Sequence, residues 1–352
     1  MNEIMIAGRK IGSAAEPFII AEMSGNHNQS LDRALQIVEQ AAMSGAHALK
    51  LQTYTADTMT LNIHSGQFHI NDKASLWNGQ SLYDLYNQAY TPWEWHQAIF
   101  EYGRKLGLIV FSSPFDETAV DFLETLGAPC YKIASFENTD LPLIRKAAST
   151  GKPVIISTGM ATVSELHEAV TACREAGSGQ IILLKCTSAY PAPVDHCNIA
   201  TIPHMRQLFD CPVGLSDHTL GMGVAIASIT MGASVIEKHF TLSRQEGGVD
   251  SAFSMEPAEM KLLVEEADKA WRAMGKIAYG PDEAQQASLQ FRRSLYAAAD
   301  IKKGEAFTRQ NTRIIRPGYG LPPKYYELIL DSRAVADIDE GTPLSWDLII
   351  GG

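Results

Sequence analysis

Four short apolar runs between residues 153 and 239 determine the fold: PVIIST (153–158), IILLKC (181–186), PVGLSD (212–217) and SVIEKH (234–239). They are apolar on both faces, as strands of a buried parallel sheet are. Toward the N-terminus, the same pattern recurs in FIIAE (18–22), ALKLQT (48–53), LIVFSS (108–113) and CYKIAS (130–135). Most intervals between these runs carry a helical repeat of apolar residues. Eight strand–helix units predict an α/β fold, a closed (β/α)8 TIM barrel.

The pattern changes near residue 280 to short strands and turns, which predicts two domains. We expect a barrel over residues 1–280 and a small β-rich domain over residues 285–352. In the second domain, DIKKGE (300–305) and DIDEGT (337–342) look alike and suggest a pseudo-repeat. Within the barrel, residues 54–96 are too many for a simple crossover and predict an insertion over the barrel mouth.

Composition excludes several classes of partner. A net charge of −11 and a pI near 5.4 argue against nucleic acid and anionic membranes, because both require clustered positive charge. The five cysteines show no CxxC pair, which favours a reducing compartment. The N-terminus lacks the apolar core of a signal peptide, and no run reaches the length of a membrane span. We therefore expect a cytoplasmic protein.

Polar or ionisable residues end every one of the eight runs. One such residue could simply face solvent, but eight together favour a site, because barrel enzymes place their chemistry at the carboxyl ends of the strands. These residues are Glu22, Lys50, Gln52, Ser112, Ser113, Lys132, Ser135, Ser157, Thr158, Lys185, Thr187, Ser216, Asp217, His218, Lys238 and His239.

The strand-end lysines predict a phosphate or carboxylate site in an otherwise acidic chain. Lys50, Lys132 and Lys185 supply charge, and nearby serine hydroxyls supply directional donors. Two alternatives stay open. The lysines could be neutralised by Glu22, Asp217 or Glu237, or one of them could form a Schiff base.

His218 and His239 end neighbouring predicted strands, so both imidazoles could bind one divalent ion. With oxygen ligands such as Glu22 or Asp250, the pair suits manganese, magnesium, iron or cobalt better than a closed zinc site. Each histidine could instead be a hydrogen-bonded core residue or a general acid or base.

Ordered motifs along nearly the whole chain resemble the sialic acid synthase family. They include AEMSGNHNQSLDRAL (21–35), FSSPFD (111–116), YKIASFEN (131–138), LKCTSAYP (184–191), GLSDHTLG (214–221) and EKHFTL (237–242). The resemblance implies a transferase that joins phosphoenolpyruvate to the open-chain aldehyde of an amino sugar. It also implies that the C-terminal domain is antifreeze-like (SAF).

The same resemblance assigns roles to residues. It implies that His218 and His239 bind a manganese-type metal, with magnesium or cobalt as alternatives, and that phosphoenolpyruvate contacts Lys50, Ser113, Lys132, Ser135, Ser157 and Ser216. Glu22, Gln52, Tyr190 and Asp250 match positions that face the sugar or the metal. Arg316 matches an arginine that enters the barrel of the other subunit in a domain-swapped homodimer. Glu22, His218, His239 and Asp250 are thus the expected catalytic set.

Within the family, residues 76–96 and 316–349 are most similar to the branch that makes pseudaminic acid. The implied sugar is 2,4-diacetamido-2,4,6-trideoxy-L-altrose. Ser188 stands where the neuraminate enzymes have a ligand-contacting asparagine, which fits a different sugar. Alternatives are an N-acetylneuraminate or legionaminate synthase, a pyruvate aldolase and a non-catalytic sugar-binding module.

Overall fold

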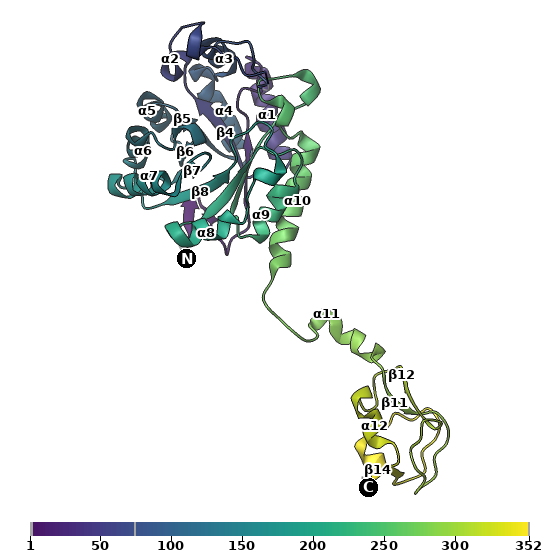
Figure 1. Cartoon of the computed structure of the whole chain (residues 1–352). Helices are drawn as coiled ribbons and strands as arrows, with labels where there is room; N and C mark the ends of the chain where they lie inside the picture. The colour runs from purple at the N-terminus through teal and green to yellow at the C-terminus, as the bar shows by residue number, and fades with distance from the viewer. Residues whose placement is uncertain (1–2, 74, 351–352) are drawn as a thin grey trace. The chain divides into compact units, whose positions relative to one another are not determined.

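The computed structural model describes residues 3–73 and 75–350, and the chain divides into two compact units, Met1–Gly275 and Lys276–Gly352. In the first unit, eight parallel strands close into a barrel in the order β10-β3-β4-β5-β6-β7-β8-β9 (Figure 1). They are β3 (Phe18–Glu22), β4 (Ala48–Thr53), β5 (Ile109–Pro114), β6 (Tyr131–Ile133), β7 (Val154–Ser157), β8 (Ile181–Cys186), β9 (Val213–Asp217) and β10 (Val235–His239). The predicted TIM barrel is confirmed.

Helices surround the barrel and bury their apolar faces against the outer side of the strands (Figure 1). They are α1 (Leu31–Met43), α4 (Trp93–Lys105), α5 (Glu117–Thr125), α6 (Leu141–Ala148), α7 (Val163–Ala176), α8 (Thr201–Phe209), α9 (Gly223–Thr230) and α10 (Pro257–Met274). Several of these helices begin with a capping side chain. At the start of α1, the Ser30 hydroxyl accepts a hydrogen bond from the Arg33 backbone amide at 3.3 Å.

The amino end of the barrel is closed by a hairpin that the sequence patterns did not predict. Strands β1 (Ile4–Ile6) and β2 (Arg9–Ile11) pair antiparallel. Their isoleucines join an apolar cluster with inward side chains such as Phe18, Phe111 and Val235. Water is thereby excluded from this end, and the open end lies at the carboxyl termini of the strands.

The insertion follows β4 and contains α2 (Ala56–Met59), a 3-10 turn (Gly66–Phe68) and α3 (Leu82–Ala89). In Figure 1 these helices lie at the opposite end of the barrel from the N-terminus. Regular structure resumes at Trp93 with α4. The insertion therefore stands at the open end of the barrel.

The second unit has its own small core, which includes Leu295, Phe307 and Leu344. It contains α11 (Glu283–Gln286), β11 (Ser294–Ala297), β12 (Thr312–Ile315), α12 (Tyr326–Ile329), β13 (Arg333–Ala334) and β14 (Ile349–Ile350). Ile301 and Ile338, at matching places in the two similar segments, exchange backbone hydrogen bonds of 2.8 and 2.9 Å. The two segments therefore pair as a pseudo-repeat.

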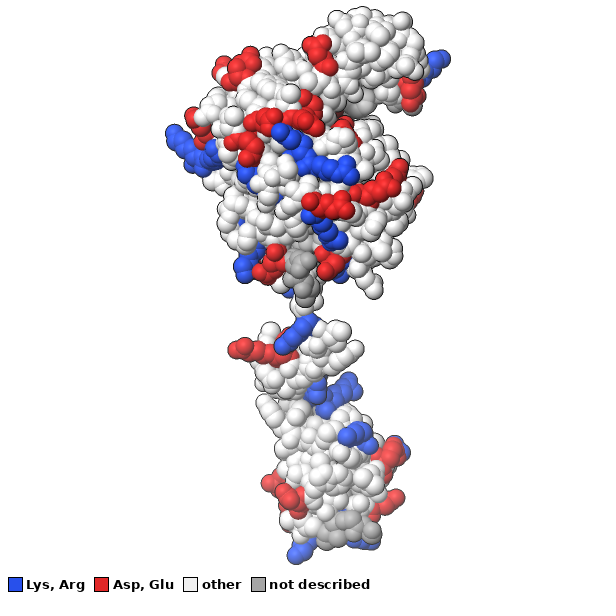
Figure 2. Space-filling model, turned by 90° about the vertical axis from the view of Figure 1, so that its left-hand side faces the viewer, with Lys and Arg blue, Asp and Glu red and all other residues white. Residues whose placement is uncertain are grey.

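Charged side chains of both signs are interspersed on the face of the barrel unit shown in Figure 2. Among the residues that the structure describes, no helix is both long and apolar enough to cross a membrane.

Candidate active site

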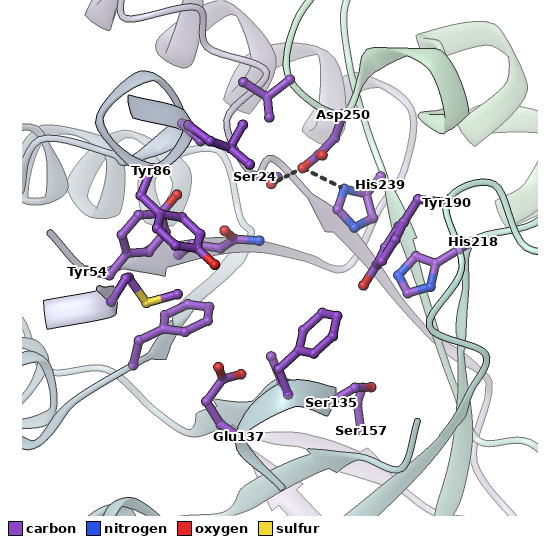
Figure 3. Close-up of a pocket in the computed structure, with 18 of the residues that line it drawn as sticks. Ser24, Tyr54, Tyr86, Ser135, Glu137, Ser157, Tyr190, His218, His239 and Asp250 are labelled. Atoms are coloured by element: carbon purple, nitrogen blue, oxygen red, sulfur yellow. Dashed lines mark hydrogen bonds and ion pairs between the residues drawn. The ribbon is translucent and has the colours of Figure 1, made fainter. Parts of the chain in front are cut away.

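A cavity of about 400 Å³ opens at the carboxyl ends of the barrel strands (Figure 3). Part of its lining comes from the strand ends and the loops that follow them: Lys50, Gln52, Lys132, Ser135, Ser157, Ser216, His218, Glu237 and His239. Another part comes from the insertion: Met59, Ile70, Trp77, Leu82, Leu85, Tyr86 and Ala89. Eight of the sixteen predicted strand-end residues thus line one cavity.

The remaining predicted site residues occupy three kinds of position. Tyr190 and Asp250 line the cavity. Glu22 and Ser113 are buried beneath the lining, where Glu22 accepts the Gln52 side-chain amide at 3.0 Å and Ser113 accepts Lys50 Nζ at 3.2 Å. Arg316 follows β12 in the second unit and is exposed there.

Four buried charges, Glu22, Lys50, Lys132 and Glu237, form what we call the floor of the cavity. Lys50 Nζ lies 2.7 Å from Glu22 Oε2 and 3.9 Å from Glu237 Oε2. Lys132 Nζ lies 3.5 Å from Glu237 Oε1, which also accepts the Ser216 hydroxyl at 3.0 Å. The alternative in which lysines pair with Glu22 and Glu237 is thus realised, and the same lysines also face the cavity.

Burial and pairing act against each other on the floor. Burial raises the pKa of Glu22, although Lys50 opposes that shift. Burial likewise lowers the pKa of Lys132, against the attraction of Glu237. Burial also opposes ionisation of Glu237, yet the two lysines outweigh it and lower its pKa. The charged forms are therefore favoured at Lys50, whose pKa is raised by its carboxylate neighbours despite burial, and at Glu237, and an anionic ligand would favour the charged form of Lys132 as well.

Hydroxyl donors stand beside the floor. Ser157 Oγ is buried without a hydrogen-bond partner among the described residues, and Ser135 Oγ accepts the Gly159 amide at 3.2 Å. A Cβ on Gly159 would lie 2.1 Å from Ser188 Oγ, so only glycine fits this close approach. A buried unpartnered hydroxyl next to two lysines suits an oxyanion ligand.

His218 and His239 lie side by side, with ring centroids 5.4 Å apart. His218 Nδ1 is 3.1 Å from the Thr187 carbonyl, so Nδ1 donates and Nε2 keeps its lone pair. Burial disfavours charge on His218, but Cys186, 3.8 Å from Nδ1, raises its pKa. Burial lowers the pKa of His239 well below its usual range, so this imidazole is neutral.

Asp250 is held next to the histidine pair by residues that follow β3. Its carboxylate accepts the Ser24 hydroxyl and lies 3.6 Å from His239 Nδ1 (Figure 3). Asn26 Oδ1 accepts the Asp250 amide at 3.3 Å, and Asn26 Nδ2 donates to Phe240 O at 3.0 Å. The loop after β10 is therefore fastened to the loop after β3.

These groups fit a divalent metal, because two imidazoles with free nitrogens and a nearby carboxylate are suitable donors. His239 Nδ1 is buried and has no hydrogen-bond partner among the described residues. In the part of the chain that the structure describes, no three His, Cys, Asp or Glu side chains are already grouped as metal ligands.

Glu137 is a cavity residue that the sequence patterns missed. It ends the short 3-10 turn Ser135–Glu137 that follows β6. Burial raises its pKa to about 7, with Lys132 opposing. Its Oε2 has no hydrogen-bond partner in the described chain. A carboxyl group with this pKa can exchange a proton near neutral pH.

Two lysines of the predicted strand-end set lie outside the cavity lining. Lys238 is paired at 3.0 Å with Asp217, and both side chains are fully buried. Lys185 Nζ donates to the Cys186 carbonyl at 2.9 Å. Asp217, a possible partner of Lys50, Lys132 or Lys185 by the sequence, therefore pairs with Lys238 instead.

Fold and site together define an enzyme of the barrel class with buried lysine–carboxylate pairs beside a histidine pair. The chain matches the model of the NeuB family over residues 37–279 and the SAF domain over residues 292–350. The chain belongs to the NeuB family, and its resemblance to the sialic acid synthases is confirmed.

Several relatives cover nearly the whole chain. It is 45% identical to the pseudaminic acid synthase of Helicobacter pylori over 333 aligned residues, which cover 94% of this chain and 97% of that protein. It is 42% identical over 327 residues to the pseudaminic acid synthase of Campylobacter jejuni, spanning 93% and 95%. The crystal structure of the N-acetylneuraminic acid synthetase of Leptospira borgpetersenii with citrate matches with a TM-score of 0.73 at 30% identity, covering 83% and 96%.

Proposed function

We propose that the chain condenses phosphoenolpyruvate with 2,4-diacetamido-2,4,6-trideoxy-L-altrose and water, giving pseudaminic acid and phosphate. The observation that carries the proposal is 45% identity, over 94% of the chain, to a pseudaminic acid synthase. The cavity supports it with separate groups for an anionic reactant and for an aldehyde. N-Acetylneuraminate and legionaminate synthases of the same family remain the alternatives.

Lys50 and Lys132 hold the phosphate and carboxylate of phosphoenolpyruvate, and Ser135, Ser157 and Ser216 complete the site. Ser113 was expected to contact phosphoenolpyruvate too, but it lies beneath the lining, so its proposed role is to position Lys50. Glu22 has no place in the cavity lining, so its proposed role is to position Lys50 and Gln52, which it contacts. Gln52, Tyr190 and Asp250 face the sugar.

In the reaction, C3 of phosphoenolpyruvate attacks C1 of the aldehyde, and the aldehyde oxygen takes up a proton. The cationic C2 then bonds to water, which releases a proton. The C2–O bond to phosphate breaks, leaving a 2-keto acid. Glu137 accepts the proton of the attacking water, since its pKa of about 7 leaves it half ionised at neutral pH.

His218 and His239 hold a divalent metal, with manganese first and magnesium or cobalt as alternatives. Such an ion supplies Lewis-acid polarisation of a carbonyl when bound. Asp250, next to His239, orients that imidazole or adds an oxygen ligand.

The working form is a domain-swapped homodimer in which Arg316 enters the partner's cavity. Ile277 and Tyr279 support an interface, because apolar side chains exposed at 93% and 97% call for a covering partner. Co-expressing Arg316→Ala with His239→Ala tests the swap. Mixed dimers should regain activity that neither variant has alone; inactive mixed dimers would contradict it.

Mass spectrometry of products tests the function itself. Phosphoenolpyruvate is mixed with the altrose derivative, N-acetylmannosamine or the legionaminate precursor, each with and without chelator. Preferred turnover of N-acetylmannosamine would overturn the proposed sugar. We place the reaction in the cytoplasm, a proposal supported by five cysteines that are all free.

A further inference from the structure

One side of the cavity is apolar and carries no formal charge. Its members, which we call the apolar wall, are Tyr54, Met59, Ile70, Leu85, Tyr86 and Phe115. Tyr54 is central: its ring packs edge-on against Phe115 at 5.2 Å and against Tyr86 at 5.8 Å. Burial raises the pKa of Tyr54 far above neutrality, so its hydroxyl stays uncharged. The wall is thus packed and uncharged, and it is apolar apart from the hydroxyl groups of Tyr54 and Tyr86.

The wall faces the groups that hold the reacting ends. In Figure 3, Tyr54 and Tyr86 lie across the cavity from His218 and His239. A sugar whose aldehyde carbon is held at the histidine pair must extend its other carbons away from that pair. The far end of the open chain therefore meets the wall.

The part of the wall formed by Met59 and Ile70 distinguishes a methyl group from a hydroxymethyl group. The methyl end of a 6-deoxy sugar buries apolar surface against these two side chains, whereas a 6-hydroxyl would lose its water there without gaining a partner from either of them. The insertion supplies most of the wall, including Met59 and Ile70.

We infer that the apolar wall binds the C6 methyl group and sets a preference for 6-deoxy over 6-hydroxy amino sugars, with Met59 and Ile70 as specificity-determining residues. The inference rests on the proposed function. Apolar sites reject an added hydroxyl by roughly 100-fold at most, so the wild-type preference should lie between about 10-fold and 100-fold in kcat/KM.

The test compares two 2,4-diacetamido sugars that differ only at C6, with phosphoenolpyruvate saturating. Met59→Gln should reduce the preference at least about fivefold by giving a 6-hydroxyl a partner. Ile70→Thr keeps the branching at Cβ, although the side chain is shorter, and should act the same way, which covers poor folding of the first variant. Leu61→Gln is the matched control, because Leu61 belongs to the same insertion but is 61% exposed. The KM for phosphoenolpyruvate should not change in any variant.

A third sugar, with N-formyl in place of N-acetyl groups, separates the C6 methyl from the acetamido methyls. If Met59→Gln changes only the acetyl-to-formyl ratio, the inference is wrong about which methyl is bound. Equal turnover of both C6 forms by the wild type would also overturn it, as would unchanged ratios in both wall variants. Absence of product from every sugar would instead refute the proposed function.

Discussion

The floor and the apolar wall of the cavity are built in different ways. Floor residues are inward positions on four different strands, and the strand register places Glu22 opposite both Lys50 and His239. Wall residues come mostly from the short helices and loops of the insertion: Met59 ends α2, Ile70 lies in a loop, and Leu85 and Tyr86 belong to α3. The proposed function thus assigns the common chemistry to the strands and the selection among sugars to the insertion.

The largest effect should follow loss of the metal ligands next to the floor. His239→Ala, or chelator, should lower kcat at least about 1,000-fold, because Lewis-acid stabilisation contributes several kcal/mol. Phosphoenolpyruvate binding, measured by calorimetry, should persist. His64→Ala is the matched control, since His64 lies on the exposed part of the insertion. Full activity after complete metal removal would contradict the metal assignment.

Glu137→Gln should lower kcat about 100-fold if Glu137 is the base for water. Since Glu137 must be ionised to act, wild-type kcat/KM should rise with pH through about 7, and the variant should lose this inflection. An unchanged pH profile in the variant would exclude Glu137 as the base.

Glu137 should also make stability depend on pH. Its pKa is raised from 4.5 to about 7 in the folded state, which therefore retains a proton that the unfolded chain releases. Unfolding free energy should fall by roughly 3 kcal/mol as pH rises across this window. Urea titrations at pH 5 and pH 8 measure this change in the free energy of unfolding, and it should be absent in Glu137→Gln. If the variant shows the same change as the wild type, another group is responsible.

Lys132→Met should raise the KM for phosphoenolpyruvate roughly 30-fold, because a hydrogen bond to a charged group is lost. Lys238→Met is the matched control: its ion pair with Asp217 is equally buried but lies outside the cavity lining. Both variants should lose stability, since Lys238→Met removes the lysine paired with the buried Asp217 carboxylate and Lys132→Met leaves Glu237 with only the more distant Lys50, at 3.9 Å. Only Lys132→Met should change the KM; equal effects would place both lysines in structural roles.

The smallest effect should follow loss of one hydrogen bond between the insertion and the loop after β10. Trp77 Nε1 donates to the Val249 carbonyl at 3.1 Å, next to Asp250. Trp77→Phe removes this bond, worth about 1 kcal/mol, so the KM for the sugar should rise about fivefold while that for phosphoenolpyruvate stays constant. Trp346→Phe, in the second unit, is the control. An increase confined to the KM for phosphoenolpyruvate would contradict the division between floor and wall.

Much of the floor was predictable because strands have a period of two. In β10, Val235, Glu237 and His239 share the inward face, and Lys238 points the other way. The same alternation of inward and outward side chains places Lys132 in the cavity and Lys185 outside it. It would also have placed Glu237 in the cavity, although the sequence patterns suggested Glu237 only as a possible partner of a lysine. Glu137 lies two residues beyond the strand-end set, so extending each strand end by one turn would have included it.

The sequence by itself determined the eight-stranded barrel, its family and the convergence of strand-end lysines, hydroxyls and histidines on one cavity. It could do so because apolar runs and side-chain alternation are local properties of the chain. Only the tertiary structure decided that Glu22 lies under the lining, that Lys238 belongs to another ion pair, and that the insertion supplies an apolar wall. These outcomes depend on burial and on contacts between distant segments, which no local pattern encodes.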